Sequence, residues 1–264
     1  MLTVSEIYIY PIKSLGGIKL SEASLTDRGF EHDRRWMLID ENNRFLSQRQ
    51  VNGMCFLEVS LHEEGLLVIN TNKSDFYYKI PFKPVDAETV TVTVWDDTCT
   101  AQLVSKEADA WFSGQLDMSV RLVYMPDDSI RRVDRSYAHN EEITSLSDGY
   151  PLLLIGQSSL DDLNSKLKEP VPMNRFRPNI VFEGGLPFQE DDMKEFSIAG
   201  VSFYGVKPCA RCVMTTIDQV SGKKSKEPLK TLSTYRQRNN NIYFGQNLLF
   251  HGQGTIRVGD TIIV

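Results

Sequence analysis

The sequence predicts a mainly β fold with a few helices, an α+β protein whose sheets are barrel-like. Many segments are rich in β-branched or aromatic residues and are bounded by turn signals, which is typical of strands. Residues 89–95 are the clearest case, because apolar and polar residues alternate along them with a period of two. Helix signals are confined to three short segments. We therefore expect sheets to form the framework of the protein.

The bulk properties are those of a soluble globular protein. The 264 residues can form one large or two ordinary domains, and 41% of them are apolar and 24% charged. The net charge of −6 argues against a general nucleic-acid binder. The N-terminus lacks signal-peptide features, and no run approaches the roughly 18 apolar residues of a membrane span. We expect a cytoplasmic protein without a membrane partner, in which Cys209 and Cys212 are thiols.

The first half of the chain predicts strands and one short helix. The strands are expected over residues 4–10, 35–40, 67–70 and 89–95. Asp96 and Asp97 close the last of these as a turn. A helix over residues 107–112 would place Ala108, Trp111 and Phe112 on one side.

The second half begins after a polar stretch, residues 125–147, that predicts a long loop or a domain junction. The apolar run 151–156 predicts a buried strand, and it leads into a helix over residues 158–167. Ser158 or Ser159 can cap that helix, and Pro170 stops it. A further helix is expected from Pro228, and two short strands about a Gly-Asp turn are expected within residues 254–264.

A C-x-x-C pair, Cys209 and Cys212, stands between two segments of strand character. Residues 201–206 alternate, Pro208 suggests a corner, and residues 213–217 are rich in β-branched residues. This context predicts a turn between two strands, unlike a thioredoxin-type pair at a helix start. The pair supplies two of the four ligands that a structural zinc site needs. The residues alone leave two interpretations, a soft-metal ligand or a redox thiol.

A possible phosphate-binding segment follows the first strand. Lys13 and Ser14 precede the glycine pair Gly16-Gly17, which could let the backbone approach an anion. The alternative is a bulge with an exposed lysine. Further along, Arg34 lies between Asp33 and a second arginine before Trp36, so it suits either an anionic ligand or a structural ion pair.

Two later segments could also bind an anion. Arg177 and Asn179 flank Pro178 ahead of an apolar strand, which fits either a ligand site or a salt-bridged loop. The helix start at Ser158 and Ser159 offers free N–H groups to a phosphate, as most helix starts do. No two of the four histidines have the i, i+4 spacing of a metal pair. Together these signals indicate a phosphate-bearing anionic ligand beside a thiol or a soft metal.

Taken together, these motifs resemble those of the MOSC proteins, which are named after the C-terminal domain of molybdenum cofactor sulfurase. The chain is most similar to the amidoxime-reducing branch, and the motifs lie in the family's order: Tyr10-Pro11-Ile12-Lys13-Ser14, Asp33-Arg34-Arg35-Trp36, Ser47-Gln48-Arg49-Gln50, Arg175-Phe176-Arg177-Pro178-Asn179, Cys209-Ala210-Arg211-Cys212, Thr215-Thr216-Ile217-Asp218 and Gly259-Asp260. The resemblance implies a β-rich, barrel-like N-terminal domain over residues 1–120 and a MOSC β-barrel domain over residues 121–264.

The resemblance also implies a molybdenum cofactor, a pterin dithiolene with a terminal phosphate. Cys212 matches the family's metal ligand, and one thiolate would complete the soft sulfur set of the metal. The positions that match the surroundings of the pterin and its phosphate are Lys13, Ser14, Arg34, Arg177, Asn179 and Arg211, with Ser158, Ser159 and Arg49 as further anion contacts. Arg211 would favour the thiolate form of Cys212.

Two functions follow from the resemblance. The first is a molybdenum-dependent oxidoreductase that reduces small N-hydroxylated substrates, such as amidoximes or N-hydroxylated nucleobases. Some relatives carry a plant-type iron–sulfur domain and others a membrane anchor. The sequence shows neither the cysteine spacing of such a domain nor an anchor, so a separate electron-donor reductase is expected. The alternative is a carrier of the cofactor or of a persulfide on Cys212. A third interpretation leaves the C-x-x-C pair a structural feature of a turn.

Overall fold

A computed structural model describes residues 1–73, 77–84 and 88–264 of the chain. Three α-helices lie within these residues, α1 (Lys106–Leu116), α2 (Gln157–Lys166) and α3 (Leu229–Ser233). Four short 3₁₀ helices accompany them, η1 (Asn52–Phe56), η2 (Met173–Arg175), η3 (Gln189–Asp191) and η4 (Val213–Thr216). None of the helices in the described ranges has the length and apolar character that a membrane crossing requires.

The C-terminal half is built around a closed ring of seven strands. These are, in spatial order, β12 (Leu152–Gly156), β13 (Ile180–Glu183), β1 (Leu2–Ile9), β19 (Thr261–Ile263), β14 (Glu195–Ile198), β15 (Val201–Ala210) and β17 (Asn241–His251). Pairing of β17 with β12 closes the barrel, and β12 and β13 are its parallel pair. Side chains such as Ile7, Phe182 and Phe203 fill its interior. Closure leaves these strands no free edges.

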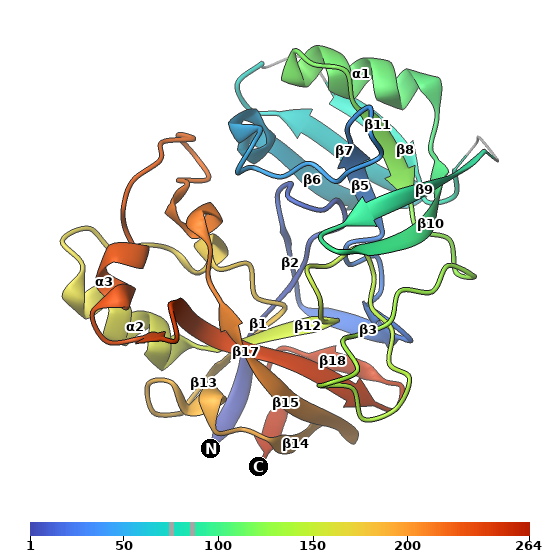
Figure 1. The fold of residues 1–264 in the computed structure, drawn as a ribbon. Helices are drawn as coiled ribbons and strands as arrows, with labels where there is room; N and C mark the ends of the chain where they lie inside the picture. The colour runs from blue at the N-terminus through green and yellow to red at the C-terminus, as the bar shows by residue number, and fades with distance from the viewer. Residues whose placement is uncertain (74–76, 85–87) are drawn as a thin grey trace.

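The N-terminal half contains two antiparallel sheets covered by a helix (Figure 1). One joins β5 (Trp36–Ile39), β11 (Arg121–Tyr124), β10 (Asp97–Leu103) and β9 (Thr89–Val94); the other joins β6 (Leu57–His62), β7 (Gly65–Asn70) and β8 (Tyr77–Pro81). Helix α1 is capped by Ser105, whose hydroxyl accepts from the Ala108 N–H, and it buries Ala108 and Phe112. A single apolar cluster joins this helix to β6, β7 and Trp36.

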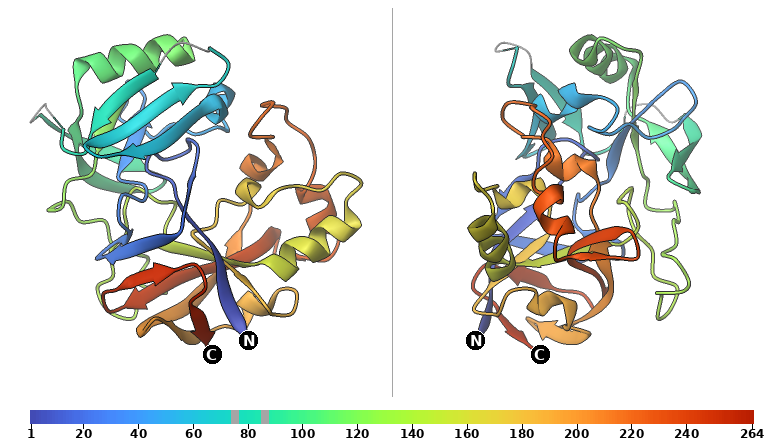
Figure 2. Two further views of the ribbon diagram at one scale, coloured as in Figure 1. Left: turned by 180° about the vertical axis from the view of Figure 1, so that it is seen from behind. Right: turned by 60° about the vertical axis from the view of Figure 1, so that its left-hand side comes forward.

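The first thirty residues link the two halves (Figure 2). Strand β1 belongs to the barrel, and β2 (Ile18–Leu20) pairs with it. Strand β3 (Glu22–Thr26) pairs with β4 (Gly29–Phe30) and with β18 (Thr255–Arg257), near the other end of the chain. A last two-residue strand, β16 (Gln237–Arg238), pairs with β17. The division of the chain at residue 120 stays a prediction, since these early strands pair with late ones.

Most of the expected elements are present, within a few residues at each end, and the mainly β architecture is confirmed. The predicted turn around the C-x-x-C pair is wrong. Strand β15 continues through Pro208 to Ala210, and Pro208 lies at an irregularity in its pairing with β17, where a missing N–H is tolerated. Residues 213–216 form η4 rather than a strand. The Thr215 hydroxyl donates to the Cys212 carbonyl, a local bond that competes with strand pairing.

Candidate functional site

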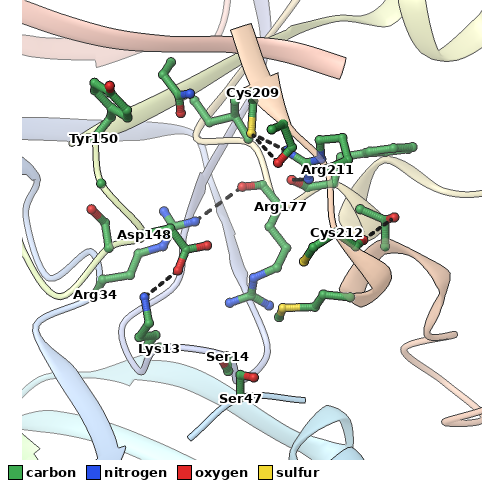
Figure 3. Close-up of a pocket in the computed structure, with 18 of the residues that line it drawn as sticks. Lys13, Ser14, Arg34, Ser47, Asp148, Tyr150, Arg177, Cys209, Arg211 and Cys212 are labelled. Carbon is green, nitrogen blue, oxygen red and sulfur yellow. Dashed lines mark hydrogen bonds and ion pairs between the residues drawn. The ribbon is translucent and has the colours of Figure 1, made fainter. Parts of the chain in front are cut away.

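A pocket lined by several charged side chains opens between the barrel and the N-terminal half (Figure 3). Its walls come from segments far apart in sequence, namely residues 13–14, Arg34, residues 45–49, 147–153, 175–179, 209–215 and Asn247. Six of the lining residues are lysine or arginine and one is a carboxylate, Asp148. The pocket is therefore strongly cationic and suits an anionic ligand.

Three of the lining residues have left-handed backbone conformations, which residues other than glycine rarely adopt. Ser14, Arg34 and Arg177 have φ values of 69°, 51° and 54°. Such conformations cost about 1 kcal/mol or more each, and they concentrate at functional sites. At these three residues of the pocket wall, the surrounding structure therefore holds the backbone in conformations that are otherwise disfavoured.

Lys13 is buried, which excludes the exposed-lysine interpretation. Only 4% of its surface is exposed, and its ammonium donates to the Leu146 carbonyl at 2.9 Å and to Asp148 Oδ1 at 2.6 Å. Burial lowers the pKa of Lys13 to about 8, although Asp148 acts in the opposite direction. Lys13 is thus a cation whose charge is sensitive to pH near neutrality.

Gly16 and Gly17, expected to bring the backbone close to an anion, do not line the pocket. A Cβ on Gly17 would stand 2.3 Å from a ring carbon of Tyr10. The glycine is therefore required for the close packing of that ring on the chain.

Arg34 lines the pocket and also makes a structural ion pair, so both sequence-based interpretations apply to it. Its guanidinium donates to Asp33 Oδ2 at 2.6 Å and to Asn179 Oδ1 at 3.0 Å. Asn179 is almost fully buried and also bonds the backbone of Leu153 and Tyr8. The amide of Asn179 therefore positions Arg34 and ties β12, β13 and β1 together.

Arg177 and Arg211 have spare hydrogen-bond donors. Arg177 donates from Nη1 to the Leu15 carbonyl at 2.7 Å, and Arg211 donates from Nη1 to Cys209 Sγ at 2.9 Å. Arg177 Nη2 and Arg211 Nε are buried and have no hydrogen-bond partner among the described residues. A buried donor left unpaired costs about 1–3 kcal/mol. The two arginines are therefore prepared for an acceptor from outside the chain, which fits a phosphate or another anion.

The two cysteines of the C-x-x-C pair differ in environment. Cys212 is exposed, whereas Cys209 is half-buried, and both line the pocket as free thiols. Figure 3 shows them projecting from different points of the 209–212 segment. Arg211 bonds Cys209 rather than Cys212, which was not expected. Cys212 precedes η4 and is accessible to a ligand in the pocket.

Ser158 and Ser159 are the two predicted site residues that the structure places elsewhere. They lie in the first turn of α2 but not on the pocket. The Ser158 hydroxyl donates to the Gly185 carbonyl at 2.6 Å, and that of Ser159 donates to Glu190 Oε2 at 2.8 Å. Glu190 is fully buried at this helix start. The group at the N-terminus of α2 is thus the protein's own Glu190 carboxyl, so no phosphate is needed there.

Arg49 lies on the pocket wall as expected, held by Ser47 Oγ at 3.1 Å and by the Trp95 ring, 4.2 Å from its guanidinium carbon. Sequence reasoning assigned no site role to Asp148, Arg175 or Ser47, which also line the pocket. Arg175 and Ser47 belong to motifs that were noted. Asp148 lies in a polar loop without any signal of its own.

The described residues contain no group of three or more histidine, cysteine, aspartate or glutamate side chains that could hold a metal. A metal in this pocket would therefore need most of its ligands from a bound cofactor, with Cys212 as the accessible protein donor. A dithiolene cofactor with a phosphate fits this requirement, since the pocket combines one exposed thiol with unpaired guanidinium donors.

Comparison with known proteins gives two family matches along the chain. A family model described as MOSC N-terminal beta barrel domain matches residues 1–119, and one described as MOSC domain matches residues 141–263. The chain is 32% identical to mitochondrial amidoxime-reducing component 1 of Mus musculus, covering 98% of this chain and 81% of the mouse protein. The human counterpart is 31% identical, with 98% and 82% covered. Molybdenum cofactor sulfurase of Oryza sativa is 30% identical, with 92% of this chain and 32% of that protein covered.

Proposed function

Because the chain belongs to the MOSC family, with an N-terminal MOSC β-barrel domain followed by a MOSC domain, its function is associated with the molybdenum cofactor, and we propose that it is a molybdenum-dependent reductase of N-hydroxylated compounds. The observation that carries the proposal is the joint presence, in one pocket, of the exposed Cys212 thiol and two buried guanidinium donors without partners. The names of the amidoxime-reducing relatives support the reaction class.

In this proposal, groups that line the pocket hold the metal and the phosphate of the cofactor. Cys212 would ligate the metal through its thiolate, and the phosphate would be held by Lys13, Ser14, Arg34 and Arg177. Arg211, Asn179 and Arg49 complete the cationic and polar wall. When bound, the cofactor would supply the two-electron redox chemistry that, with two protons, converts an N-hydroxy group to its amine or imine form and water.

The side chains of the protein would bind the anionic cofactor, orient it and neutralise its negative charge. Arg34, fixed by Asp33 and Asn179, presents a donor of fixed direction, so little entropy is lost when an anion binds. Lys13 adds a positive charge, and Asp148 helps to keep its amine protonated. The described residues contain no cluster of three or more metal-ligating side chains, which an iron–sulfur centre would require, so we propose that a separate reductase supplies the electrons. We further propose a cytoplasmic setting and a small-molecule substrate rather than a nucleic-acid polymer.

A carrier function is the second candidate, favoured by the exposure of Cys212 and by the similarity to molybdenum cofactor sulfurase. Such a carrier would deliver the cofactor, or a persulfide sulfur on Cys212, to another protein. It would not need to turn over N-hydroxy compounds.

The test combines metal content with turnover. Wild type, Cys212→Ser and the control Cys55→Ser, a buried thiol away from the pocket, are purified from a host that makes the cofactor. We expect near-stoichiometric molybdenum in wild type and control and at least a tenfold lower content in Cys212→Ser. With a chemical reductant, the loaded protein should reduce benzamidoxime or hydroxylaminopurine. Loaded protein that leaves both compounds unchanged but passes cofactor to an apo-acceptor would favour the carrier.

A further inference from the structure

Tyr10 lies directly behind the pocket, at the end of β1, and no role has so far been assigned to its side chain. Only 2% of its surface is exposed. Its backbone is fixed on both sides, since its N–H donates to Asp33 Oδ1 at 2.7 Å and its carbonyl accepts from the Arg34 N–H at 2.9 Å. Its hydroxyl is buried and has no hydrogen-bond partner among the described residues.

The ring of Tyr10 contacts the guanidinium groups of two pocket arginines. The guanidinium carbon of Arg34 is 4.3 Å from the ring centroid, and that of Arg177 is 4.1 Å from it. Both distances are well within the range of attractive cation–π contacts, about 6 Å. One aromatic ring therefore touches both cations, although they approach the pocket from different segments of the chain.

We propose that Tyr10 is a positioning residue whose π-system holds Arg34 and Arg177 together in the geometry that an anion needs. The two positively charged guanidinium groups repel each other, and Arg34 contributes to the lowered pKa of Arg177, although burial is the larger cause. The negative faces of an aromatic ring oppose this repulsion without neutralising either charge, which a carboxylate would do. The cations thus remain available to the ligand.

The contacts of the two arginines show why Arg177 depends most on the ring. Arg34 has three further acceptors, in Asp33, Asn179 and the Arg177 carbonyl. Among the described residues the guanidinium of Arg177 has one hydrogen-bond acceptor, the Leu15 carbonyl, and the backbone of Arg177 is in the left-handed region. Loss of the Tyr10 ring would therefore release mainly the Arg177 side chain.

The unpartnered hydroxyl separates this proposal from a hydrogen-bonding role. Tyr10→Phe removes a buried polar group without a partner, so it should leave anion binding unchanged and should not destabilise the fold. A ring that only fills space, by contrast, could be replaced by any side chain of similar volume. The electronic character of the ring is what the proposal requires.

The experiment measures binding of inorganic pyrophosphate to the cofactor-free protein by calorimetry, with position 10 occupied by tyrosine, phenylalanine, a series of increasingly fluorinated phenylalanines, or leucine. Fluorination weakens the quadrupole at nearly constant volume. We expect tyrosine and phenylalanine to agree within twofold, affinity to fall stepwise with each fluorine, and leucine to weaken binding about tenfold, equivalent to about 1.4 kcal/mol. Tyr78→Leu, which loses ring packing on Trp111 in the N-terminal half, should leave the affinity unchanged.

Affinity that is the same across the fluorinated series would overturn the proposal, as would a loss of more than threefold in Tyr10→Phe. If Tyr10→Leu fails to fold, the fluorinated series still decides the question. The inference rests on the proposed function only in taking the ligand to be a phosphate-bearing anion. Pyrophosphate binding that follows the ring's electronics, in a protein that never reduces an N-hydroxy compound, would support the role of Tyr10 and reject the reductase.

Discussion

At the scale of single residues, the buried ammonium of Lys13 forms an ion pair with the carboxylate of Asp148 in the pocket. Lys13 is buried with a pKa of about 8, and Asp148 is the group that raises this value against the effect of burial. Three quarters of the Asp148 side chain is exposed, so an amide can replace its carboxylate without a packing defect. The charge of Lys13, and with it the anion affinity, should therefore depend on Asp148.

Asp148→Asn is expected to lower the pKa of Lys13 below 8. Since a lysine binds anions in its protonated form, the pyrophosphate affinity of wild type should decline as the pH rises through about 8, and that of the variant should decline at lower pH. Affinities measured from pH 6 to pH 9 test this shift. Asp127→Asn, which removes an exposed partner of Arg35, serves as the control. Superimposable pH profiles for Asp148→Asn and wild type would contradict the expectation.

At the scale of elements, helix α2 illustrates a correct structural prediction that led to a wrong site. The helix is present over Gln157–Lys166, yet Glu190 occupies its N-terminal end through Ser159. Burial raises the pKa of Glu190 from 4.5 to about 7. The folded protein therefore holds this proton up to a higher pH than the unfolded chain does. Its stability must fall as the pH rises between these two values.

Glu190→Gln should remove this dependence. Near pH 5 the Glu190 carboxyl is protonated, and it is then uncharged and similar in size to a glutamine. The free energy of unfolding should therefore be similar for the wild type and the variant. Above pH 7 the variant should be more stable than wild type, by about 3 kcal/mol at most, since each pKa unit corresponds to about 1.4 kcal/mol. Urea unfolding at pH 5 and pH 8 measures the difference, with the exposed Glu195→Gln as control. A difference that is equal at both pH values would show that Glu190 does not titrate in this range.

The elements also show where sequence reasoning succeeds. Alternation identified β9, and helical spacing with a following proline identified α2, because burial of one face imposes these periods locally. Residues 213–217, which the sequence predicts as a strand, instead form η4 over Val213–Thr216. Their β-branched character reflects Thr215 and Thr216, whose hydroxyls bond backbone carbonyls three residues earlier and so support η4. The β propensity of threonine cannot be separated from such local bonding without the structure.

At the scale of the whole molecule, the site is assembled by contacts between distant segments. The motifs containing Lys13, Arg34, Arg177 and Cys212 were each visible in the sequence, but their convergence rests on β1 pairing with β13 and on the barrel closure of β17 with β12. The residue pattern indicated one phosphate-bearing ligand beside a thiol or a soft metal, and the resemblance to a family implied that this ligand is a molybdenum cofactor with Cys212 as its metal ligand. Asp148 and the ring of Tyr10 could be assigned only from the fold, because neither spacing nor propensity indicates a side chain's partners.

The two halves meet at a reciprocal pair of side-chain amides beside the pocket. Gln48 is fully buried and donates to the Ser14 carbonyl at 2.8 Å and to Gln219 Oε1 at 3.0 Å, while Gln219 donates back to Gln48 Oε1 at 2.9 Å. This pair connects the 45–49 wall, the Lys13–Ser14 segment and the loop that follows η4. Each buried hydrogen bond of this kind contributes about 0.5–1.5 kcal/mol.

Gln48→Ala should therefore loosen the pocket mouth without unfolding either half. We expect amide hydrogen exchange to accelerate at least tenfold over residues 217–224, and pyrophosphate affinity to fall several-fold because Ser14 loses its anchor. The matched control is Asn70→Ala, which breaks an amide pair with Gln115 inside the N-terminal half. That variant should leave exchange over residues 217–224 and pyrophosphate binding unchanged. If Gln48→Ala accelerates exchange throughout the N-terminal half instead, Gln48 stabilises that half rather than the junction between the two. In the wild type, the pocket would then be held in shape by the barrel segments alone.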